Sequence, residues 1–279
     1  MSTQKKFSQT LLLTVLGLFC MAIMLFPLYW VIVSSLKNTV ELFRSPPTLF
    51  PQQIDWSPYI ANFVQNQDML HYMGNSLQIA VGTMLLSLLL GTPIAYGLAR
   101  LPVGGKNVFL LAFLVAQMFP SIMLALPLFV MFTRIGLMNT LLAVILAITT
   151  RTLPFAVLVL RPFFLSLPRE LEDAAFIDGC GLWGSFYRII LPLSRPGLLT
   201  VAVLTFLMGW SDFLFPLAFI SDDTKRPLTL GLYKFISEYG TRWNDLMAVS
   251  TVAALPIILV FMFAQRYVTS GLVAGAVKD

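Results

Sequence analysis

The sequence predicts an all-α integral membrane protein with six transmembrane helices. Hydrophobic residues make up 58% of the 279-residue chain and charged residues only 11%, whereas soluble domains carry about 25% charged residues. Six apolar segments are also long enough to cross the roughly 30 Å hydrocarbon core of a bilayer as α-helices. We place the spans at residues 11–35, 76–98, 108–126, 140–160, 198–220 and 246–264.

The first span is expected to be retained rather than cleaved as a signal peptide. Its apolar run of about 25 residues is longer than the roughly 7–15 residues of a signal peptide's apolar region, and no A-x-A-like cleavage site follows it. Each span contains a proline, and we expect these prolines to kink the helices. They are Pro27, Pro93, Pro120, Pro154, Pro216 and Pro256.

The basic residues favour an orientation with both termini in the cytoplasm. In this orientation the inside segments carry ten basic and five acidic residues, and the outside loops carry seven of each. Cytoplasmic loops of membrane proteins have such an excess of Lys and Arg, which accounts for the net charge of +5 without a nucleic-acid partner. The segment 161–196 and the tail 265–279 are then cytoplasmic, and the loops 36–75 and 221–245 face outward.

The residues needed for a catalytic, metal or nucleotide site are missing from the sequence. Cys20, Cys180 and His71 form neither a disulfide framework nor a spaced set of metal ligands. The segment Gly104-Gly105-Lys106 lacks the leading glycine and the hydroxyl residue of a phosphate-binding loop. We therefore expect no catalytic residue, no metal and no bound cofactor. An intramembrane enzyme, one alternative, has no nucleophile–base pair to use.

The segment 161–196 is patterned as a helix–glycine–helix hairpin. Ser166 can cap a helix that opens at Pro168 and has acidic residues in its first turn. Gly179 can supply the left-handed conformation that ends this helix. A second helix at about 182–190 has aromatic residues at helical spacing, and Pro192 stops it. Two alanines of the first helix form a small-residue notch that a second backbone can approach.

This hairpin resembles the hallmark of permease subunits in binding-protein-dependent ABC importers. The hallmark is Glu-Ala-Ala, three residues, Gly, nine residues, Ile, one residue and Leu-Pro. The matching residues are Asp173, Ala174, Ala175, Gly179, Ile189, Leu191 and Pro192. Asp replaces Glu at the first position, which keeps the charge and shortens the side chain by one methylene. The flanks at 136–140, 167–171, 191–196 and 271–278 resemble the carbohydrate branch of the family, and nearly the whole chain is similar to the six-span second permease of maltose-type importers.

The resemblance implies a fold, a function and a set of partners. It implies the type I ABC importer permease fold in a bacterial or archaeal plasma (inner) membrane. The partners are a second homologous permease, an extracytoplasmic solute-binding protein, membrane lipid and two ATPase subunits, which bind ATP and Mg²⁺. In maltose-type importers the tail that corresponds to residues 270–279 reaches between the ATPase subunits, and the resemblance implies a similar role for this segment. The implied ATPase-coupling residues are Glu172, Asp173, Ala174, Ala175, Asp178, Gly179, Ile189, Leu191 and Pro192.

The implied solute is a carbohydrate or a related polyol or glycoside. A permease for glycerol phosphate or another small solute is an alternative of the same class. An ion-coupled secondary transporter is an alternative of another class, which predicts acidic sites inside the membrane. Only Asp212 supports it, and the hairpin has no role in such a transporter.

Polar residues inside the spans are candidates for the solute path. Arg151 and Asp212 lie near the middle of spans four and five, where a charge costs about 2.5–3.5 kcal/mol on insertion scales. They can line the solute path, pair with each other, or have only a structural role. Trp210 can stack on a sugar ring or pack among neighbouring aromatic residues, and Gln117 is a candidate of the same kind.

Overall fold

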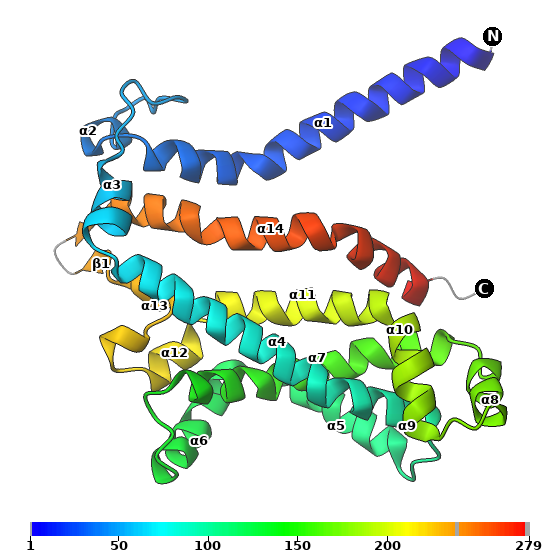
Figure 1. Ribbon diagram of the computed structural model, residues 1–279. Coiled ribbons are helices and arrows are strands. Elements are labelled where there is room, and N and C mark those ends of the chain that lie inside the picture. Colours follow the sequence, from blue (N-terminus) through cyan, green and yellow to red (C-terminus); the bar gives the residue numbers. More distant parts are fainter. Residues whose placement is uncertain (1, 238–239, 277–279) are drawn as a thin grey trace. The chain divides into compact units, whose positions relative to one another are not determined.

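The computed structural model describes residues 2–237 and 240–276, with side chains described at 10–236 and 240–265. This part of the chain forms two compact units. The first unit comprises the described residues of 1–69 and 232–254, and the second those of 70–231 and 255–276. Figure 1 shows both units as almost entirely helical.

The first unit combines the N-terminal helix with short elements from both ends of the chain. Its two strands pair antiparallel, with Ile236 opposite Thr241. Residues 10–27 of α1 are all exposed, so their apolar side chains are available to lipid or to another protein. The elements are α1 (Ser2–Ser35), α2 (Thr39–Leu42), α3 (Ser57–Ile60), a π-helical turn (Ala61–Gln65), β1 (Ile236–Ser237), β2 (Gly240–Thr241) and the start of α14 (Trp243–Ala276).

The loop between α2 and α3 is tied down by the buried carboxylate of Glu41. This carboxylate accepts hydrogen bonds from the Thr48 hydroxyl at 2.7 Å and from the Gln52 amide at 2.9 Å. The Thr48 hydroxyl, the Gln52 amide and the Lys37 ammonium together lower the pKa of Glu41, although burial acts in the opposite direction. Lys37 is itself buried, donates to the Thr48 carbonyl, and lies 4.7 Å over the ring of Trp30. Hydrogen bonds to Glu41 and Lys37 therefore hold this loop in a defined conformation.

The second unit is built around α4, α7 and α11. In a membrane, helices associate through close packing and hydrogen bonds rather than through apolar burial, so small residues at the interface are favoured. A β-carbon added at Gly209 would lie 2.8 Å from Cα of Ala80, and the hydroxyls of Ser87 and Thr152 are 2.6 Å apart. The helices are α4 (Asp68–Arg100), α5 (Lys106–Met118), α6 (Ser121–Arg134), α7 (Leu141–Ser166), α11 (Arg195–Ser211), α12 (Leu214–Phe219) and α13 (Leu228–Tyr233).

Four helices of the described chain are long and apolar enough to cross a membrane unbroken. They are Thr10–Ser35, Asp68–Arg100, Leu141–Ser166 and Trp243–Gln265. They cover the spans expected at 11–35, 76–98, 140–160 and 246–264, except for residue 140, which caps the third helix. The helix α14 continues to Ala276, through most of the segment expected as a tail, and residues 277–279 lie outside the described part. Two bent helix pairs, Lys106–Met118 with Ser121–Arg134 and Leu182–Leu193 with Arg195–Ser211, raise the number of candidate spans to at most six.

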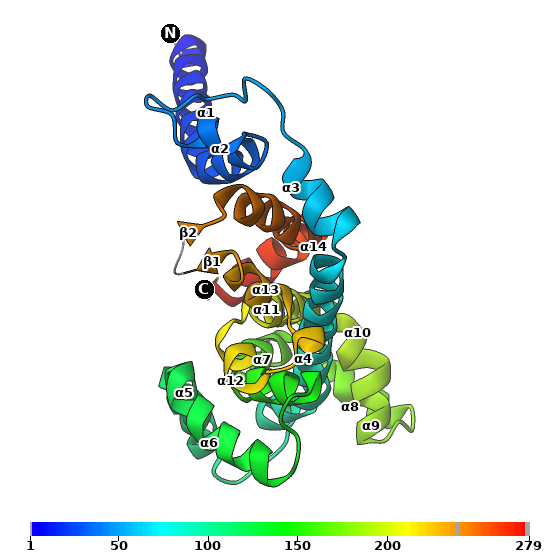
Figure 2. The same ribbon diagram turned by 90° about the vertical axis from the view of Figure 1, so that its left-hand side faces the viewer.

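The third expected span, 108–126, is corrected from one kinked helix to two separate helices. The helix α5 ends at Met118, α6 begins at Ser121, and the two are bent by 99° (Figure 2). Phe119 is extended because it precedes Pro120, and the proline has no amide hydrogen to continue the helix. The proline therefore breaks this span instead of kinking it.

The fifth expected span, 198–220, is also corrected to two helices. The helix α11 ends at Ser211, and α12 begins at Leu214. Asp212 between them has an extended backbone (φ −68°, ψ 131°). Its side chain accepts a hydrogen bond from the Phe215 amide at 3.0 Å, as a helix-capping residue does. A capping side chain in mid-segment is the local reason for the break.

Candidate functional site: the helix–glycine–helix hairpin

The segment between α7 and α11 forms the expected hairpin, with a different start. Ser166 does not cap the hairpin, because α7 extends to this residue and its hydroxyl donates to the Phe163 carbonyl at 2.8 Å. Arg169 stands at the start of the first helix instead. Figure 1 shows the hairpin at one end of α11. Its elements are α8 (Glu170–Ile177), α9 (Leu182–Ser185), a π-helical turn (Phe186–Ile190) and α10 (Leu191–Leu193).

Gly179 makes the turn between the two limbs of the hairpin. Its φ of +82° lies in the left-handed region that side chains with a β-carbon resist. The Cys180 amide donates to the Ala175 carbonyl at 2.9 Å, and the Gly179 amide donates to the Phe176 carbonyl at 3.1 Å. These two bonds are the Schellman pattern that ends a helix at a glycine. The conformation expected for Gly179 is therefore present.

The first limb turns an acidic residue toward the protein. The Glu172 side chain accepts a hydrogen bond from the Tyr96 hydroxyl at 2.6 Å, and its other oxygen lies 3.2 Å from Nε of Arg100. The alignment of the second contact is not that of a hydrogen bond, so its attraction is electrostatic. Ala175, one turn further on, is 1% exposed. The small-residue notch thus has only Ala174 on its outer side, while Ala175 packs inward.

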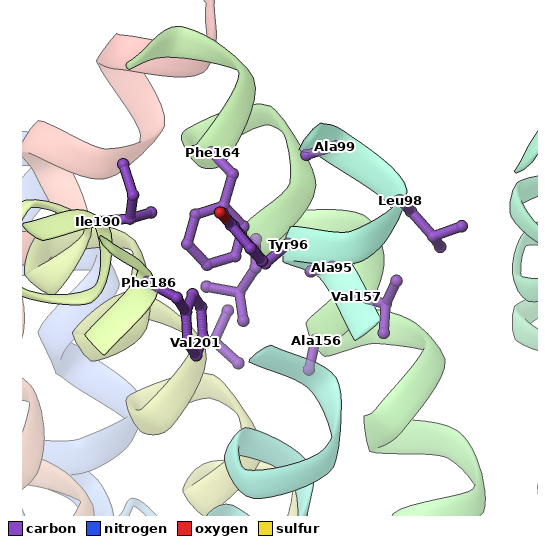
Figure 3. Packing of buried hydrophobic residues seen from close by; sticks show 11 residues of the cluster. Ala95, Tyr96, Leu98, Ala99, Ala156, Val157, Phe164, Phe186, Ile190 and Val201 are labelled. Atoms are coloured by element: carbon purple, nitrogen blue, oxygen red, sulfur yellow. The ribbon is translucent and has the colours of Figure 1, made fainter. Parts of the chain in front are cut away.

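The second limb is held by an aromatic core. Phe186 and Ile190 are buried in a cluster with residues of α4, α7 and α11 (Figure 3). The ring of Tyr96 lies 4.6 Å from that of Phe186 and 5.7 Å from that of Phe164. Three motif residues have structural roles here. Ile189 and Leu191 pack against the same cluster. Pro192 stands in the first turn of α10, so it does not stop the second helix as expected.

The outer surface of the hairpin combines charge with exposed apolar groups. Asp173, Ala174, Asp178 and Gly179 are exposed. Large apolar side chains of the hairpin are exposed as well, and exposed apolar groups of this kind mark a surface that another protein or lipid covers. The exposed fractions are 45% for Phe176, 87% for Ile177, 39% for Leu182, 62% for Trp183 and 59% for Tyr187.

The four solute-path candidates are only partly brought together. The Gln117 amide donates to the Arg151 carbonyl at 2.7 Å and so ties α5 to α7. No ion pair joins Arg151 and Asp212 among the described side chains. The carbonyl of Asp212 accepts from the Thr229 hydroxyl at 2.8 Å. Trp210 is 4% exposed and stacks on Phe206 at 6.1 Å. These contacts give Asp212 a capping role and Trp210 a packing role.

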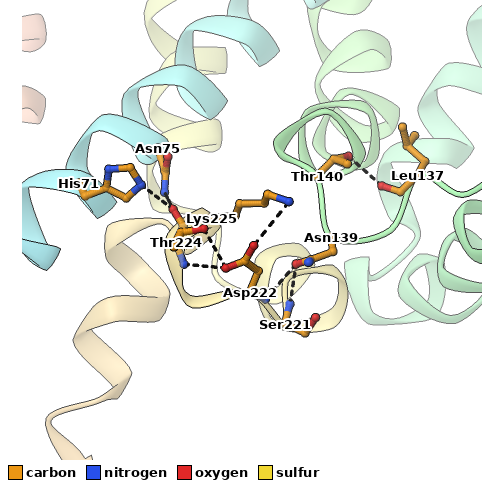
Figure 4. A network of polar contacts seen from close by, with 9 residues as sticks. All are labelled: His71, Asn75, Leu137, Asn139, Thr140, Ser221, Asp222, Thr224 and Lys225. Carbon is orange, nitrogen blue, oxygen red and sulfur yellow. Dashed lines mark hydrogen bonds and ion pairs between the residues drawn. The ribbon is translucent and has the colours of Figure 1, made fainter.

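A polar cluster at the other end of α4 and α11–α12 was not singled out as a site from the sequence (Figure 4). Asn139, with a φ of +61°, accepts hydrogen bonds from the Ser221 amide at 3.1 Å and the Asp222 amide at 2.9 Å. The Asn75 side chain donates to the carbonyls of Thr224 and Arg226, both at 2.9 Å. The nearby glycine–asparagine stretch at 136–139 is a sequence signal for such a left-handed loop residue.

Comparisons with known proteins give the family. Residues 87–273 match the family described as binding-protein-dependent transport system inner membrane component. The arabinooligosaccharides transport system permease protein AraQ of Halalkalibacterium halodurans is 37% identical, over 96% of this chain and 96% of that protein. The trehalose/maltose transport system permease protein MalG of Thermococcus litoralis is 32% identical, with the same coverage of both chains.

A solved structure confirms the fold. A chain of a bacterial ABC transporter involved in the import of the acidic polysaccharide alginate superposes with a TM-score of 0.80, over 96% of this chain and 98% of that one. Its sequence identity is 21%, so this likeness concerns the fold alone. The predicted type I ABC importer permease fold is thereby confirmed. The chain belongs to the family of binding-protein-dependent transport system inner membrane components, as a multi-pass membrane permease.

Proposed function

We propose that this chain is one transmembrane subunit of an ATP-driven importer that moves a carbohydrate, or a related polyol or glycoside, into the cytoplasm. The observation that carries the proposal is the hairpin, which presents the exposed motif residues Asp173, Ala174 and Gly179 on a rigid surface. The relatives named for arabinooligosaccharide and trehalose/maltose transport support a carbohydrate solute. The importer takes its solute from an extracytoplasmic binding protein and works by alternating access.

The partners follow from surfaces that the chain leaves uncovered. The exposed face of the hairpin fits docking on ATPase subunits, of which there are two, and these bind ATP and Mg²⁺. The chain itself binds no cofactor. The exposed apolar residues of α1 fit membrane lipid and a second, homologous permease. With both termini in the cytoplasm of a bacterial or archaeal cell, the hairpin faces the ATPases and the loops 36–75 and 221–245 face the binding protein.

The hairpin has the physical properties that a coupling element needs. ATP-driven closure must pass through a joint between proteins, and a rigid element transmits such motion better than a mobile loop. Buried residues hold both limbs: Glu172 in the first, and Phe186 and Ile190 in the second. Asp173, Ala174 and Asp178 remain exposed for the partner. Movement of the ATPases is thereby passed to α4, α7 and α11.

Reconstitution of the whole importer tests this function. The chain is purified with the second permease and the ATPases, placed in proteoliposomes with the binding protein, and supplied with labelled oligosaccharides or glycerol phosphate. We expect uptake of an oligosaccharide that needs both internal ATP and the binding protein. Uptake driven by an ion gradient without ATP would contradict the proposal. Uptake of glycerol phosphate but of no oligosaccharide would show that the solute is glycerol phosphate rather than a carbohydrate.

A further inference from the structure

We infer that Glu172 is a positioning residue that clamps the hairpin to the ends of α4 and α7, rather than a residue that touches the ATPase. This inference rests on the proposed coupling role of the hairpin. It assigns different roles to two adjacent acidic residues of the hairpin. Glu172 holds the hairpin in place from its buried side, and Asp173 contacts the partner from its exposed side.

The clamp joins three elements through one buried arginine. The side chains of Arg100 and Glu172 are 5% and 10% exposed, and their nearest N and O atoms lie 3.2 Å apart. Arg100 also donates from Nη2 to the carbonyl of Leu167, the residue that follows α7. Arg100 is the last residue of α4, and Glu172 lies in the first turn of α8. One guanidinium thus connects the ends of α4 and α7 with the first limb of the hairpin.

Tyr96 extends the clamp to the second limb. Its hydroxyl donates to Glu172 at 2.6 Å, and its ring contacts Phe186 at a centroid distance of 4.6 Å. Figure 3 shows the Tyr96 ring among Phe164, Phe186 and Ile190. A single side chain of α4 is therefore in contact with both limbs. Any movement of the hairpin against α4 must break a charged contact, a hydrogen bond or an aromatic packing contact.

The burial of the pair explains why its loss affects position rather than docking. A charge that loses its partner in a buried site is strongly unfavourable, so the surroundings rearrange to bring water or another group to it. Removing the carboxylate of Glu172 leaves the Arg100 guanidinium in that situation. Because the carboxylate is covered by the protein itself, it offers little surface to a partner. The expected defect is a loosened hairpin that still presents its outer face.

Asp173 supplies the matched control. It adjoins Glu172 in the sequence and has the same charge, but its side chain is exposed. Within the described side chains, no hydrogen bond or ion pair engages the Asp173 carboxylate. Neutralising Asp173 therefore changes the outer surface and leaves the clamp intact. The pair Glu172→Gln and Asp173→Asn separates the two roles.

The test measures position and coupling in the same variants. Spin labels at Ile177→Cys and Lys106→Cys, both exposed, report the distance between the hairpin and the start of α5, with Cys20 and Cys180 replaced by Ser. Proteoliposomes of the full importer give the ATP hydrolysed per solute transported. We expect Glu172→Gln and Arg100→Met each to broaden the distance distribution and to raise the ATP-to-solute ratio roughly fivefold, and the double variant to be no worse than the worse single one.

The control and the conservative variant complete the test. Asp173→Asn should keep the narrow distance distribution and lose ATPase co-purification, whereas Tyr96→Phe should shift both clamp readouts slightly in the direction of Glu172→Gln. Tyr96→Phe keeps the buried ring, so it decides the question if Glu172→Gln does not accumulate in the membrane. Unchanged distances and ratios in the clamp variants, or the same defect in Glu172→Gln and Asp173→Asn, would overturn the clamp. If the wild-type chain retains no ATPase, the proposed function fails, and the distances alone still decide the clamp.

Discussion

The hairpin and the polar cluster at the other end of α4 are held in place by different chemistry. The hairpin is fixed by a buried ion pair and an aromatic core around Tyr96 and Phe186. The polar cluster is fixed mainly by neutral side chains, such as Asn75 and Asn139, that bind backbone groups of the segment 221–226. Side chain–backbone bonds set the path of a loop without a large core, whereas an element that transmits movement needs packed contacts to the helices it moves. The hairpin is therefore built as part of the helix bundle, whereas the polar cluster is a loop whose path is set by side chain–backbone hydrogen bonds.

The largest expected effect comes from removing the aromatic core of the hairpin. Phe186→Ala deletes a side chain that is 2% exposed, and such deletions cost about 3–5 kcal/mol of folding free energy. We expect the second limb to detach and become sensitive to protease in detergent. The neighbouring Tyr187→Ala is the control, because Tyr187 is 59% exposed. Equal protection of the limb in both variants would show that the core does not hold the hairpin.

The turn of the hairpin should be the next most sensitive feature. Gly179→Val places a β-branched residue at a φ of +82°, at a cost of about 1–2 kcal/mol. Co-purification with the ATPases should fall, while the membrane helices stay folded. Gly181→Val is the matched control, because Gly181 has a φ of −75° and open space around its Cα atom. An intact complex with Gly179→Val would count against the hairpin as the coupling element.

In the polar cluster, Asn139 gives a smaller and more local effect. Asn139→Ala loses two acceptor contacts and disfavours the φ of +61°, which together cost about 1–3 kcal/mol. Hydrogen exchange at the Ser221 and Asp222 amides should accelerate, with no change in the hairpin. Asn139→Gly removes the acceptors but tolerates the conformation, so exchange should be intermediate. A change that spreads to the hairpin would contradict the separation of the two regions.

The smallest expected effect is a pH dependence in the same cluster. The Thr224 hydroxyl and amide donate to Asp222 and lower its pKa below the ordinary value of 3.8. Their contribution to stability is therefore complete above that pH and is lost as the pH falls through the lower folded pKa. Thr224→Val removes the hydroxyl and should move the Asp222 titration, followed by NMR in micelles, back toward the ordinary value. An unchanged titration would exclude the hydroxyl as the cause.

Much of the fold was predictable from the sequence, because apolar length and helix-ending residues are local signals. The expected spans and the left-handed Gly179 belong to this class. The breaks at Phe119 and Asp212 were not predicted, since a proline or an acid inside an apolar run can kink, cap or break a helix depending on its neighbours. The inward orientation of the Glu172 side chain was also not predicted. It depends on Arg100, which lies far away in the sequence, and no periodicity shows such a partner.

Site-specific cross-linking from the two regions tests the central claim most directly. A photoreactive residue is placed at Ile177, the most exposed apolar residue of the hairpin, and in a second variant at Ser221 in the polar cluster. Both variants are expressed with the second permease, the ATPases and the binding protein. We predict a cross-link from Ile177 to an ATPase subunit and none from Ser221 to the ATPases. A cross-link from Ser221 to an ATPase, or none from Ile177 in an importer that still transports, would contradict the account.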